Sequence, residues 1–233
     1  MSNKAKNMST AELAALIDHS ILKPEFTSDD INREIQRAVK FGCKTVCINP
    51  TALEAAIEGT MGSSTEICVV ADFPFGCSST SGKLSEVERL CRIDEVDEID
   101  VVSNYGWIRS AKWEAWEREV SVLVAAAANY SKVLKLIVES DALTDEELIE
   151  ATKRSSLLGV DFVKSSTGFF TGGRHEGAST RVMKLMLGSV QGSSQIKGSG
   201  GIRTQEHFFE LIDLGVGRMG IGFASIEAVL GIK

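Results

Sequence analysis

The stretch "LLGVDFVKSS", residues 157–166, decides the fold, because it reads as the end of a helix, a glycine, a short apolar strand and a lysine. Two other stretches repeat the order, "KFGCKTVCI" at 40–48 and "DLGVGRMGI" at 213–221. In each, a glycine stands where a helix would stop, and an apolar strand follows within a few residues. Glycine readily takes the left-handed conformation that ends helices, so the three stretches predict turns from a helix into a strand.

Short apolar runs and helical patterns alternate along the whole chain. Ile31, Ile35 and Ala38 recur at helical spacing, and Thr144 with Glu147 is the signature of a capping box at the start of another helix. The apolar runs are not strictly alternating, which is typical of parallel strands covered by helices on both faces. Eight such runs are predicted to be strands: 16–22, 44–49, 66–73, 98–104, 132–140, 161–166, 195–200 and 218–222.

Eight strands alternating with helices predict an α/β protein with a TIM (β/α)8 barrel. No linker rich in Pro, Gly or Ser divides the chain, so we predict a single barrel domain over residues 10–233 after a flexible tail at 1–9. A doubly wound open sheet is the alternative, because periodicity does not give the order of the strands. The absence of a GxGxxG motif after the first strand weakens that alternative.

Composition narrows the class of ligand and the compartment. The chain has 233 residues, a formal net charge of −7 and a pI near 5.1, which argue against a nucleic-acid partner and favour a small molecule. No run approaches the roughly 18 apolar residues of a membrane span, and the opening "MSNKAKNMST" lacks the apolar core of a signal peptide. Five cysteines without a CxxC pair indicate reduced thiols. We therefore predict a cytoplasmic protein that needs no membrane.

Polar residues recur at the carboxyl ends of the predicted strands, where barrel enzymes place their chemistry. Charges inside apolar runs are unfavourable unless they are paired, so their recurrence at one level predicts a shared site. A single lysine there could equally be a structural residue paired with a carboxylate. The residues concerned are Asp18, Cys47, Asp72, Asp100, Glu139, Lys164 and Lys197.

Lys164, at the end of an apolar strand, is the candidate nucleophile. A lysine that is partly desolvated and close to a second cation loses its proton more easily, and only the neutral amine attacks a carbonyl. Lys197, on the next strand, would be that cation. Asp100 would transfer protons, through a water molecule, as the carbinolamine and the enamine form.

Seven segments, in order along the chain, resemble those of the deoxyribose-phosphate aldolase family: "LIDHSILKP", "TVCINP", "VVADFPFG", "EVDEIDVVSNYG", "VLKLIVES", "DFVKSSTGF" and "KGSGGIRT". The resemblance implies a class I aldolase on a (β/α)8 barrel that reversibly cleaves 2-deoxyribose 5-phosphate to acetaldehyde and glyceraldehyde 3-phosphate, without a metal or organic cofactor. It also implies that Lys164 forms the Schiff base, that Lys197 is the second lysine and that Asp100 transfers protons. Asp18 and Cys47 match positions that line the substrate pocket.

The segment after the last predicted strand departs from the family pattern. Family members usually read close to "RIGTSSG", in which hydroxyl side chains and backbone amides hold the phosphate, whereas this chain reads "RMGIGFAS" at 218–225. Ile221, Gly222 and Phe223 stand where hydroxyl residues are expected. We therefore predict a relaxed phosphate requirement. The remaining candidates for substrate binding are Thr167, Gly168, Gly200, Gly201, Arg203 and Gly222.

Other functions stay open at this point. A barrel that only binds a sugar phosphate would use the lysines as counter-charges, and a related Schiff-base lyase or a transaldolase would use a ketone donor. The three histidines lack the spacing of zinc ligands, so no metal site is predicted. A homodimer is the expected assembly, since two-fold dimers are the commonest oligomers of soluble enzymes.

Overall fold

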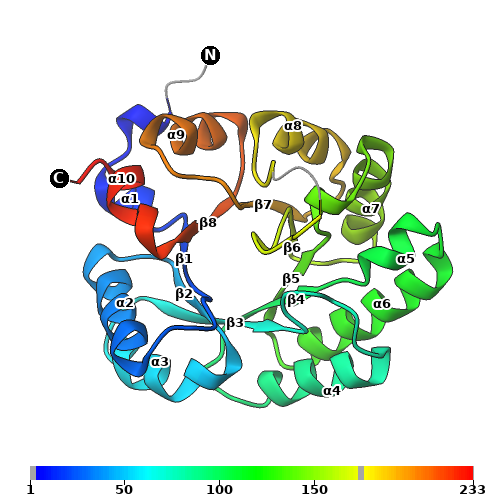
Figure 1. Cartoon of the computed structure of the whole chain (residues 1–233), viewed down its shortest axis with the longest axis horizontal. Coiled ribbons are helices and arrows are strands. Elements are labelled where there is room, and N and C mark those ends of the chain that lie inside the picture. The colour runs from blue at the N-terminus through cyan, green and yellow to red at the C-terminus, as the bar shows by residue number, and fades with distance from the viewer. Residues whose placement is uncertain (1–3, 173–175, 233) are drawn as a thin grey trace.

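The eight predicted strands form a closed parallel barrel in the computed structural model, which describes residues 4–172 and 176–232 (Figure 1). The strands follow chain order, and the first pairs with the last, so the open-sheet alternative is wrong. The barrel is therefore a (β/α)8 fold. Its strands are β1 Ile17–Ile21, β2 Thr45–Ile48, β3 Glu66–Ala71, β4 Glu98–Val102, β5 Val133–Ile137, β6 Phe162–Lys164, β7 Gln195–Ser199 and β8 Arg218–Gly222.

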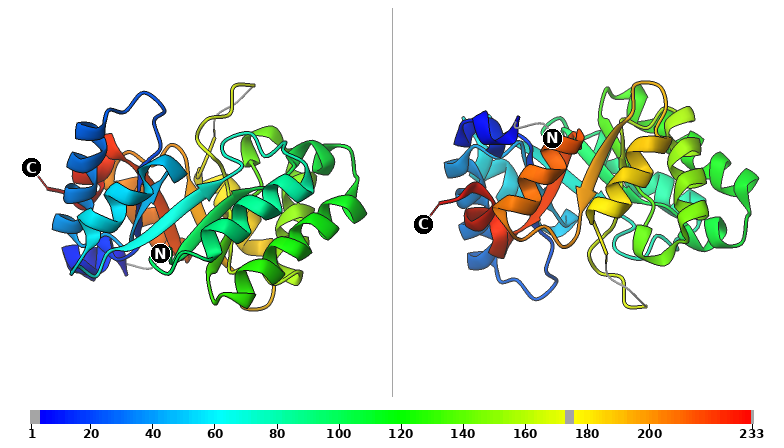
Figure 2. Two further views of the ribbon diagram at one scale, coloured as in Figure 1. Left: turned by 90° about the horizontal axis from the view of Figure 1, so that it is seen from below. Right: turned by 90° about the horizontal axis from the view of Figure 1, so that it is seen from above.

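Helices surround the barrel and cover the outer face of every strand (Figures 1 and 2). The longer ones are α2 Ser28–Phe41, α3 Leu53–Thr60, α4 Thr80–Cys91, α6 Trp113–Asn129, α7 Asp145–Leu157, α8 Thr180–Ser189 and α9 Gln205–Leu214. The shorter ones are α1 Thr10–Ala14, α5 Tyr105–Arg109 and α10 Ile226–Leu230. Single 3-10 turns lie at η1 Ala5–Asn7, η2 Pro50–Ala52, η3 Ser140–Ala142 and η4 Phe223–Ser225.

The local signals of the sequence correspond to the observed ends of the helices. Thr144 and Glu147 form the predicted capping box at the start of α7, where the Thr144 hydroxyl accepts from the Glu147 amide. Gly42 and Gly215 end α2 and α9 in the left-handed conformation, with φ of 71° and 99°. These glycines turn the chain back into the barrel, so each strand begins at the same end of the molecule.

Residues 4–9 differ from the predicted flexible tail, of which residues 1–3 lie outside the described part of the chain. Ala5 is fully buried, and its amide donates to Asp213 Oδ1 at 3.0 Å. Ser9 caps α1 through a capping box with Glu12. A small apolar residue at position 5 thus packs against α9, which a short polar segment did not predict.

The loops after β1 and after β6 project from the same end of the barrel (Figure 2). This end holds the carboxyl ends of all the strands, because the strands are parallel. None of the helices in residues 4–172 and 176–232 has the length and apolar character needed to cross a membrane.

Candidate active site

Lysines from three neighbouring strands converge on Asp100 inside the barrel. Asp100 lies on β4 and is fully buried. Its Oδ2 accepts hydrogen bonds from Lys164 Nζ at 2.7 Å and from Lys197 Nζ at 2.6 Å. Its Oδ1 accepts from Lys135 Nζ at 2.7 Å. Because β5, β6 and β7 each supply one lysine, the register of the barrel, and not a local turn, builds this arrangement.

Asp18 on β1 forms the second centre of the same arrangement. It lies 2.5 Å from Lys197 Nζ and accepts a hydrogen bond from Arg218 Nη1 at 2.7 Å. Glu98 on β4 completes it, at 3.1 Å from Arg218 Nη1 and 2.6 Å from Lys135 Nζ. Every ionised group here is therefore within contact of at least one opposite charge, as buried charges require.

These seven buried residues form what we call the ionic cluster, and its charges are unequal. If all groups are ionised, four basic side chains face three acidic ones, which leaves one positive charge in excess. Loss of a proton from one amine would bring the cluster to neutrality. Its members are Lys135, Lys164, Lys197, Arg218, Asp18, Glu98 and Asp100.

The pKa directions indicate which groups stay ionised. Burial opposes the charge of Asp100, but the ammonium groups of Lys135, Lys164 and Lys197 outweigh it and hold the pKa of Asp100 well below its usual range. Burial also disfavours the charge of Lys197, yet Asp100 and Asp18 raise its pKa above the ordinary value. Asp100 thus stays a carboxylate and Lys197 stays an ammonium group across the neutral range.

Lys164 has the fewest acidic partners among the three lysines. Lys135 lies within ion-pair distance of Asp18, Glu98 and Asp100, and Lys197 within that of Asp18 and Asp100. In the described part of the chain, Lys164 contacts a single carboxylate, that of Asp100. Lys164 is therefore the amine whose positive charge is least compensated.

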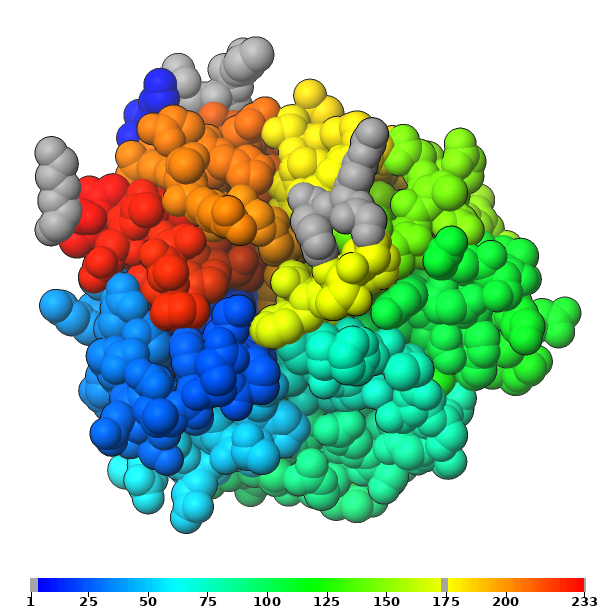
Figure 3. Space-filling model, in the orientation of Figure 1, coloured from blue at the N-terminus to red at the C-terminus, as the bar shows by residue number. Residues whose placement is uncertain are grey.

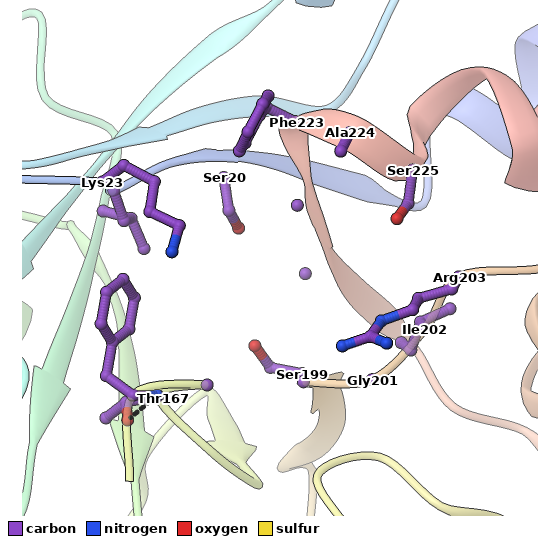
Figure 4. Close-up of a pocket in the computed structure, with 16 residues that line it drawn as sticks. Ser20, Lys23, Thr167, Ser199, Gly201, Ile202, Arg203, Phe223, Ala224 and Ser225 are labelled. Atoms are coloured by element: carbon purple, nitrogen blue, oxygen red, sulfur yellow. Dashed lines mark hydrogen bonds between the residues drawn. The ribbon is translucent and has the colours of Figure 1, made fainter. Parts of the chain in front are cut away.

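Above the ionic cluster, the barrel opens into a pocket of about 250 Å³ (Figure 4). Side chains two residues apart on a strand point to the same face, so Ser20 follows Asp18 and Ser199 follows Lys197, one layer nearer the opening. Gly220 occupies the same layer on β8. A Cβ atom there would lie 2.9 Å from Ser199 Oγ and 3.6 Å from Lys197 Cε. A side chain at Gly220 would thus crowd Ser199 and Lys197, between the pocket and the ionic cluster.

The predicted site residues divide between the two levels. Cys47 and Asp18 lie inside the barrel, and Cys47 Sγ is 3.9 Å from Asp100 Oδ2. The other predicted binding residues all line the pocket: Thr167, Gly168, Gly200, Gly201, Arg203 and Gly222.

Asp72 and Glu139, which were expected in the shared site, stabilise loops instead. Both have left-handed backbone, with φ of 48° and 59°. The Asp72 carboxylate accepts from the Ser78 amide at 3.1 Å, and Glu139 Oε2 accepts from Thr167 Oγ1 at 2.5 Å. The chain turns away from the strand direction at both residues, and this takes their side chains out of the ionic cluster.

The segment with the altered phosphate motif turns part of its residues away from the pocket. Ile221 is fully buried outside the pocket lining, whereas Phe223 lines the pocket and its ring also packs edge-on against Phe26, with centroids 4.9 Å apart. Ser225, displaced along the chain, nevertheless lines the pocket (Figure 4). One hydroxyl group of this segment therefore remains at the site.

The ionic cluster contains three residues that were not predicted, Lys135, Glu98 and Arg218. Their signal was present in the sequence, because Glu98 stands two residues before Asp100, and Lys135 lies in the middle of the apolar run "VLKLI". Attention to the carboxyl ends of strands alone missed charges that lie deeper on the same inward faces.

Three side chains could offer ligand atoms to a metal ion, Cys47, Cys68 and Asp100, whose atoms lie within 4.8 Å of one another. Both oxygens of Asp100 already accept from lysines, and Lys135 Nζ lies 3.1 Å from Cys68 Sγ. A cation there would have to displace ammonium groups, so the donor set suits amine chemistry better than metal binding. His19 pairs with Glu34 and His207 with the Ala178 carbonyl, whereas His175 lies outside the described residues.

Comparison with known proteins gives the same family from sequence and from structure. Residues 13–228 match the family model described as DeoC/LacD family aldolase. The deoxyribose-phosphate aldolase of Staphylococcus saprophyticus is 37% identical over 220 residues, which cover 94% of this chain and 96% of that protein. The corresponding enzyme of Staphylococcus haemolyticus is 36% identical over the same coverage.

The solved structures include a tetrameric deoxyribose phosphate aldolase from Aeropyrum pernix. It superposes with a TM-score of 0.84 at 27% identity, covering 96% of this chain and 91% of that one. The similarity extends over the whole barrel, including all strands that supply the ionic cluster.

Proposed function

Because the chain belongs to the DeoC/LacD aldolase family, we propose that it is a class I aldolase that cleaves 2-deoxy-D-ribose 5-phosphate to acetaldehyde and D-glyceraldehyde 3-phosphate. As a member of this family, it is an enzyme that makes and breaks carbon–carbon bonds. One observation carries the proposal: a buried carboxylate, Asp100, holds two amines, Lys164 and Lys197, on one oxygen inside the barrel, in the layer below a pocket lined by Ser199.

The roles of these residues follow from their charges and partners. Lys164 has the least compensated charge, which makes it the amine best suited to react as a neutral nucleophile. Lys197 stays protonated and keeps positive charge beside Lys164. Asp100 touches both amines and can carry a proton between the nucleophile and the substrate.

Cleavage begins when the neutral Lys164 amine attacks C1 of the open-chain sugar. The carbinolamine loses water and becomes an iminium ion, in which the C1–N bond carries the positive charge. A proton then leaves the C3 hydroxyl, the C2–C3 bond breaks, and its electron pair forms the C1–C2 double bond of a neutral enamine. Glyceraldehyde 3-phosphate departs with the C3 aldehyde.

The cycle closes with protonation and hydrolysis. The enamine takes up a proton at C2, which restores an iminium ion, and water releases acetaldehyde and the free amine. Asp100 is buried among ammonium groups, so it can hold or return these protons only through a water molecule or the substrate hydroxyls in the pocket. The same steps in reverse order join the two aldehydes.

The pocket supplies the binding groups for the rest of the sugar. We assign Arg203 and the backbone of Gly168, Gly200, Gly201 and Gly222 to the phosphate end, together with the Thr167 side chain. Asp18 and Cys47 would contact the reacting end, next to the lysines. The relaxed phosphate requirement stays a prediction.

Reductive trapping tests the proposal directly. Acetaldehyde with a borohydride reductant should replace one amine hydrogen by an ethyl group, a net gain of C2H4, and peptide mapping should place it on Lys164. Lys164→Met, which keeps the length of the side chain without the amine, should not be labelled, although Lys135 and Lys197 remain. Labelling of an unrelated surface lysine with no signal at 164 would contradict the assignment.

We further propose that the enzyme works in the cytoplasm and assembles as a homodimer. All five cysteines are free, and two of them, Cys47 and Cys68, lie beside Asp100, which is compatible with a reducing compartment. Light scattering of the purified protein gives the assembly, with a tetramer, the state of the Aeropyrum pernix relative, as the competing outcome.

A further inference from the structure

The pocket above the ionic cluster has the chemistry of an anion site. Its lining contains two positively charged side chains, Lys23 and Arg203, and no acidic residue. Hydroxyl groups of Ser20, Ser199 and Ser225 also face it (Figure 4). In a protein with a net charge of −7, such a local surplus of positive charge is a selective feature of this opening.

Lys23 and Arg203 reach the pocket from different elements. Lys23 follows β1, and Arg203 follows β7, and both charged groups point into the same space from two sides (Figure 4). In the part of the chain that the structure describes, neither side chain forms an ion pair, whereas every charge of the ionic cluster has an opposite partner. Two unpaired cations that face one space suit the binding of a phosphate group.

The ammonium group of Lys23 lies over the ring of Phe169, beside the pocket. Its Nζ lies 5.5 Å from the centroid of the Phe169 ring, and this ring packs edge-on against Phe73 at 5.3 Å. The Phe169 amide donates to Thr167 Oγ1, which in turn donates to the buried Glu139. The segments after β1 and β6 meet on this face of the molecule (Figure 3). The ring that Lys23 contacts is thus itself held by contacts with the segments that follow β5 and β6.

We propose that Lys23 is a specificity-determining residue of this aldolase, which binds the substrate phosphate opposite Arg203. The inference rests on the proposed function and adds a residue to it. The layer that holds Ser20 and Ser199 lies two residues, or roughly 7 Å, nearer the opening than Asp18 and Lys197. Lys23 lies at the opening beyond that layer, so a five-carbon chain bound at Lys164 would extend its phosphate toward Lys23.

The test compares a phosphorylated and an unphosphorylated substrate in matched variants. We define the phosphate preference as kcat/KM for 2-deoxyribose 5-phosphate divided by kcat/KM for 2-deoxyribose. Lys23→Met should lower this preference about tenfold or more, the usual effect of losing one charge-assisted hydrogen bond. Lys23→Arg should restore most of it. Lys184→Met removes an exposed lysine of α8 that does not line the pocket, and it should leave the preference unchanged.

Inorganic phosphate provides a second readout at the same site. As a competitive inhibitor it should bind Lys23→Met more weakly, by the same factor as the preference falls. If the phosphate preference of Lys23→Met equals that of the wild type, the proposal is overturned. This includes the case in which both kcat/KM values fall equally and inhibition by phosphate does not change.

Failure of the proposed function gives a different pattern. A wild-type protein that is not trapped by acetaldehyde at Lys164 is not the proposed aldolase, and calorimetric titration with inorganic phosphate then still decides whether Lys23 binds the anion. Trapping at Lys164 together with equal phosphate affinity in wild type and Lys23→Met would refute the role of Lys23 alone. A wild-type phosphate preference of several thousandfold would refute the predicted relaxed phosphate requirement. The role of Lys23 would still be decided by the comparison of Lys23→Met with the wild type.

Discussion

The ionic cluster and the pocket opening place the same kinds of side chain in opposite environments. Inside the barrel, Lys135, Lys164 and Lys197 are buried, and each contacts a carboxylate. At the opening, Lys23 and Arg203 are exposed and face a space without acidic residues. Burial with opposite charges controls protonation, whereas exposure without partners leaves a charge free to bind an anion. Depth in the barrel, more than residue type, therefore separates the residues proposed for chemistry from those proposed for recognition.

Removal of the reacting amine should have the largest effect. Lys164→Met removes the covalent route, so kcat/KM for 2-deoxyribose 5-phosphate should fall by several orders of magnitude. Circular dichroism and inorganic phosphate binding should remain near wild type, because Lys164 does not line the opening. Substantial turnover by this variant would show that the inner region is not the catalytic one.

Replacement of the central carboxylate, Asp100, should have the second largest effect. Asp100→Asn keeps the shape of the side chain but removes its charge and its capacity to hold a proton, so we expect kcat to fall roughly 10²- to 10⁴-fold. Trapping of acetaldehyde at Lys164 should persist at a reduced rate, since imine formation needs the amine first. Near-normal turnover would mean that another group transfers the protons.

Loss of the second lysine should change the pH dependence as well as the rate. Lys197→Met removes a positive charge beside Lys164, which favours the protonated, unreactive form of that amine. The acid limb of the kcat/KM profile should therefore move to higher pH, with a loss on the order of 100-fold at neutral pH. A slower variant with the wild-type pH profile would contradict an electrostatic role for Lys197.

A change in salt concentration should have the smallest effect of the four tests, and it should act differently on the pocket opening and on the ionic cluster. Exposed charges are screened within about 8 Å at physiological ionic strength, and buried pairs are screened much less. Raising sodium chloride from low to high concentration should lower the phosphate preference a few-fold, while the rate of acetaldehyde trapping at Lys164 changes little. Equal salt sensitivity of both measurements would remove the distinction between opening and interior.

The fold was predictable because each element carries its own local signal. Glycines at 42, 159 and 215, the capping box of α7 and eight apolar runs give helix ends and strands without reference to the rest of the chain. Closure of the barrel depends on the pairing of β1 with β8, and no local pattern in the sequence predicts that pairing.

The site was predictable in part, for the same reason. Lys164 is the last residue of β6, whereas Asp100 and Lys197 lie in the middle of β4 and β7, and the structure brings the three side chains together. Asp72 and Glu139 also stand at strand ends, but positive φ angles turn them toward loops, and periodicity does not predict such backbone. Lys23 lies beyond a strand end, and its position depends on the Phe169 ring from a loop far away in sequence.

The surplus of one positive charge in the barrel bears on the balance between covalent intermediates. An iminium ion on Lys164 would carry the same charge as the ammonium group it replaces and would keep that surplus, whereas the enamine that follows carbon–carbon cleavage is neutral. Formation of the enamine would therefore bring the ionic cluster to neutrality, with Lys197, Lys135 and Arg218 facing three carboxylates. In the proposed reaction, the step that breaks the carbon–carbon bond would thus also remove the least compensated positive charge of the barrel.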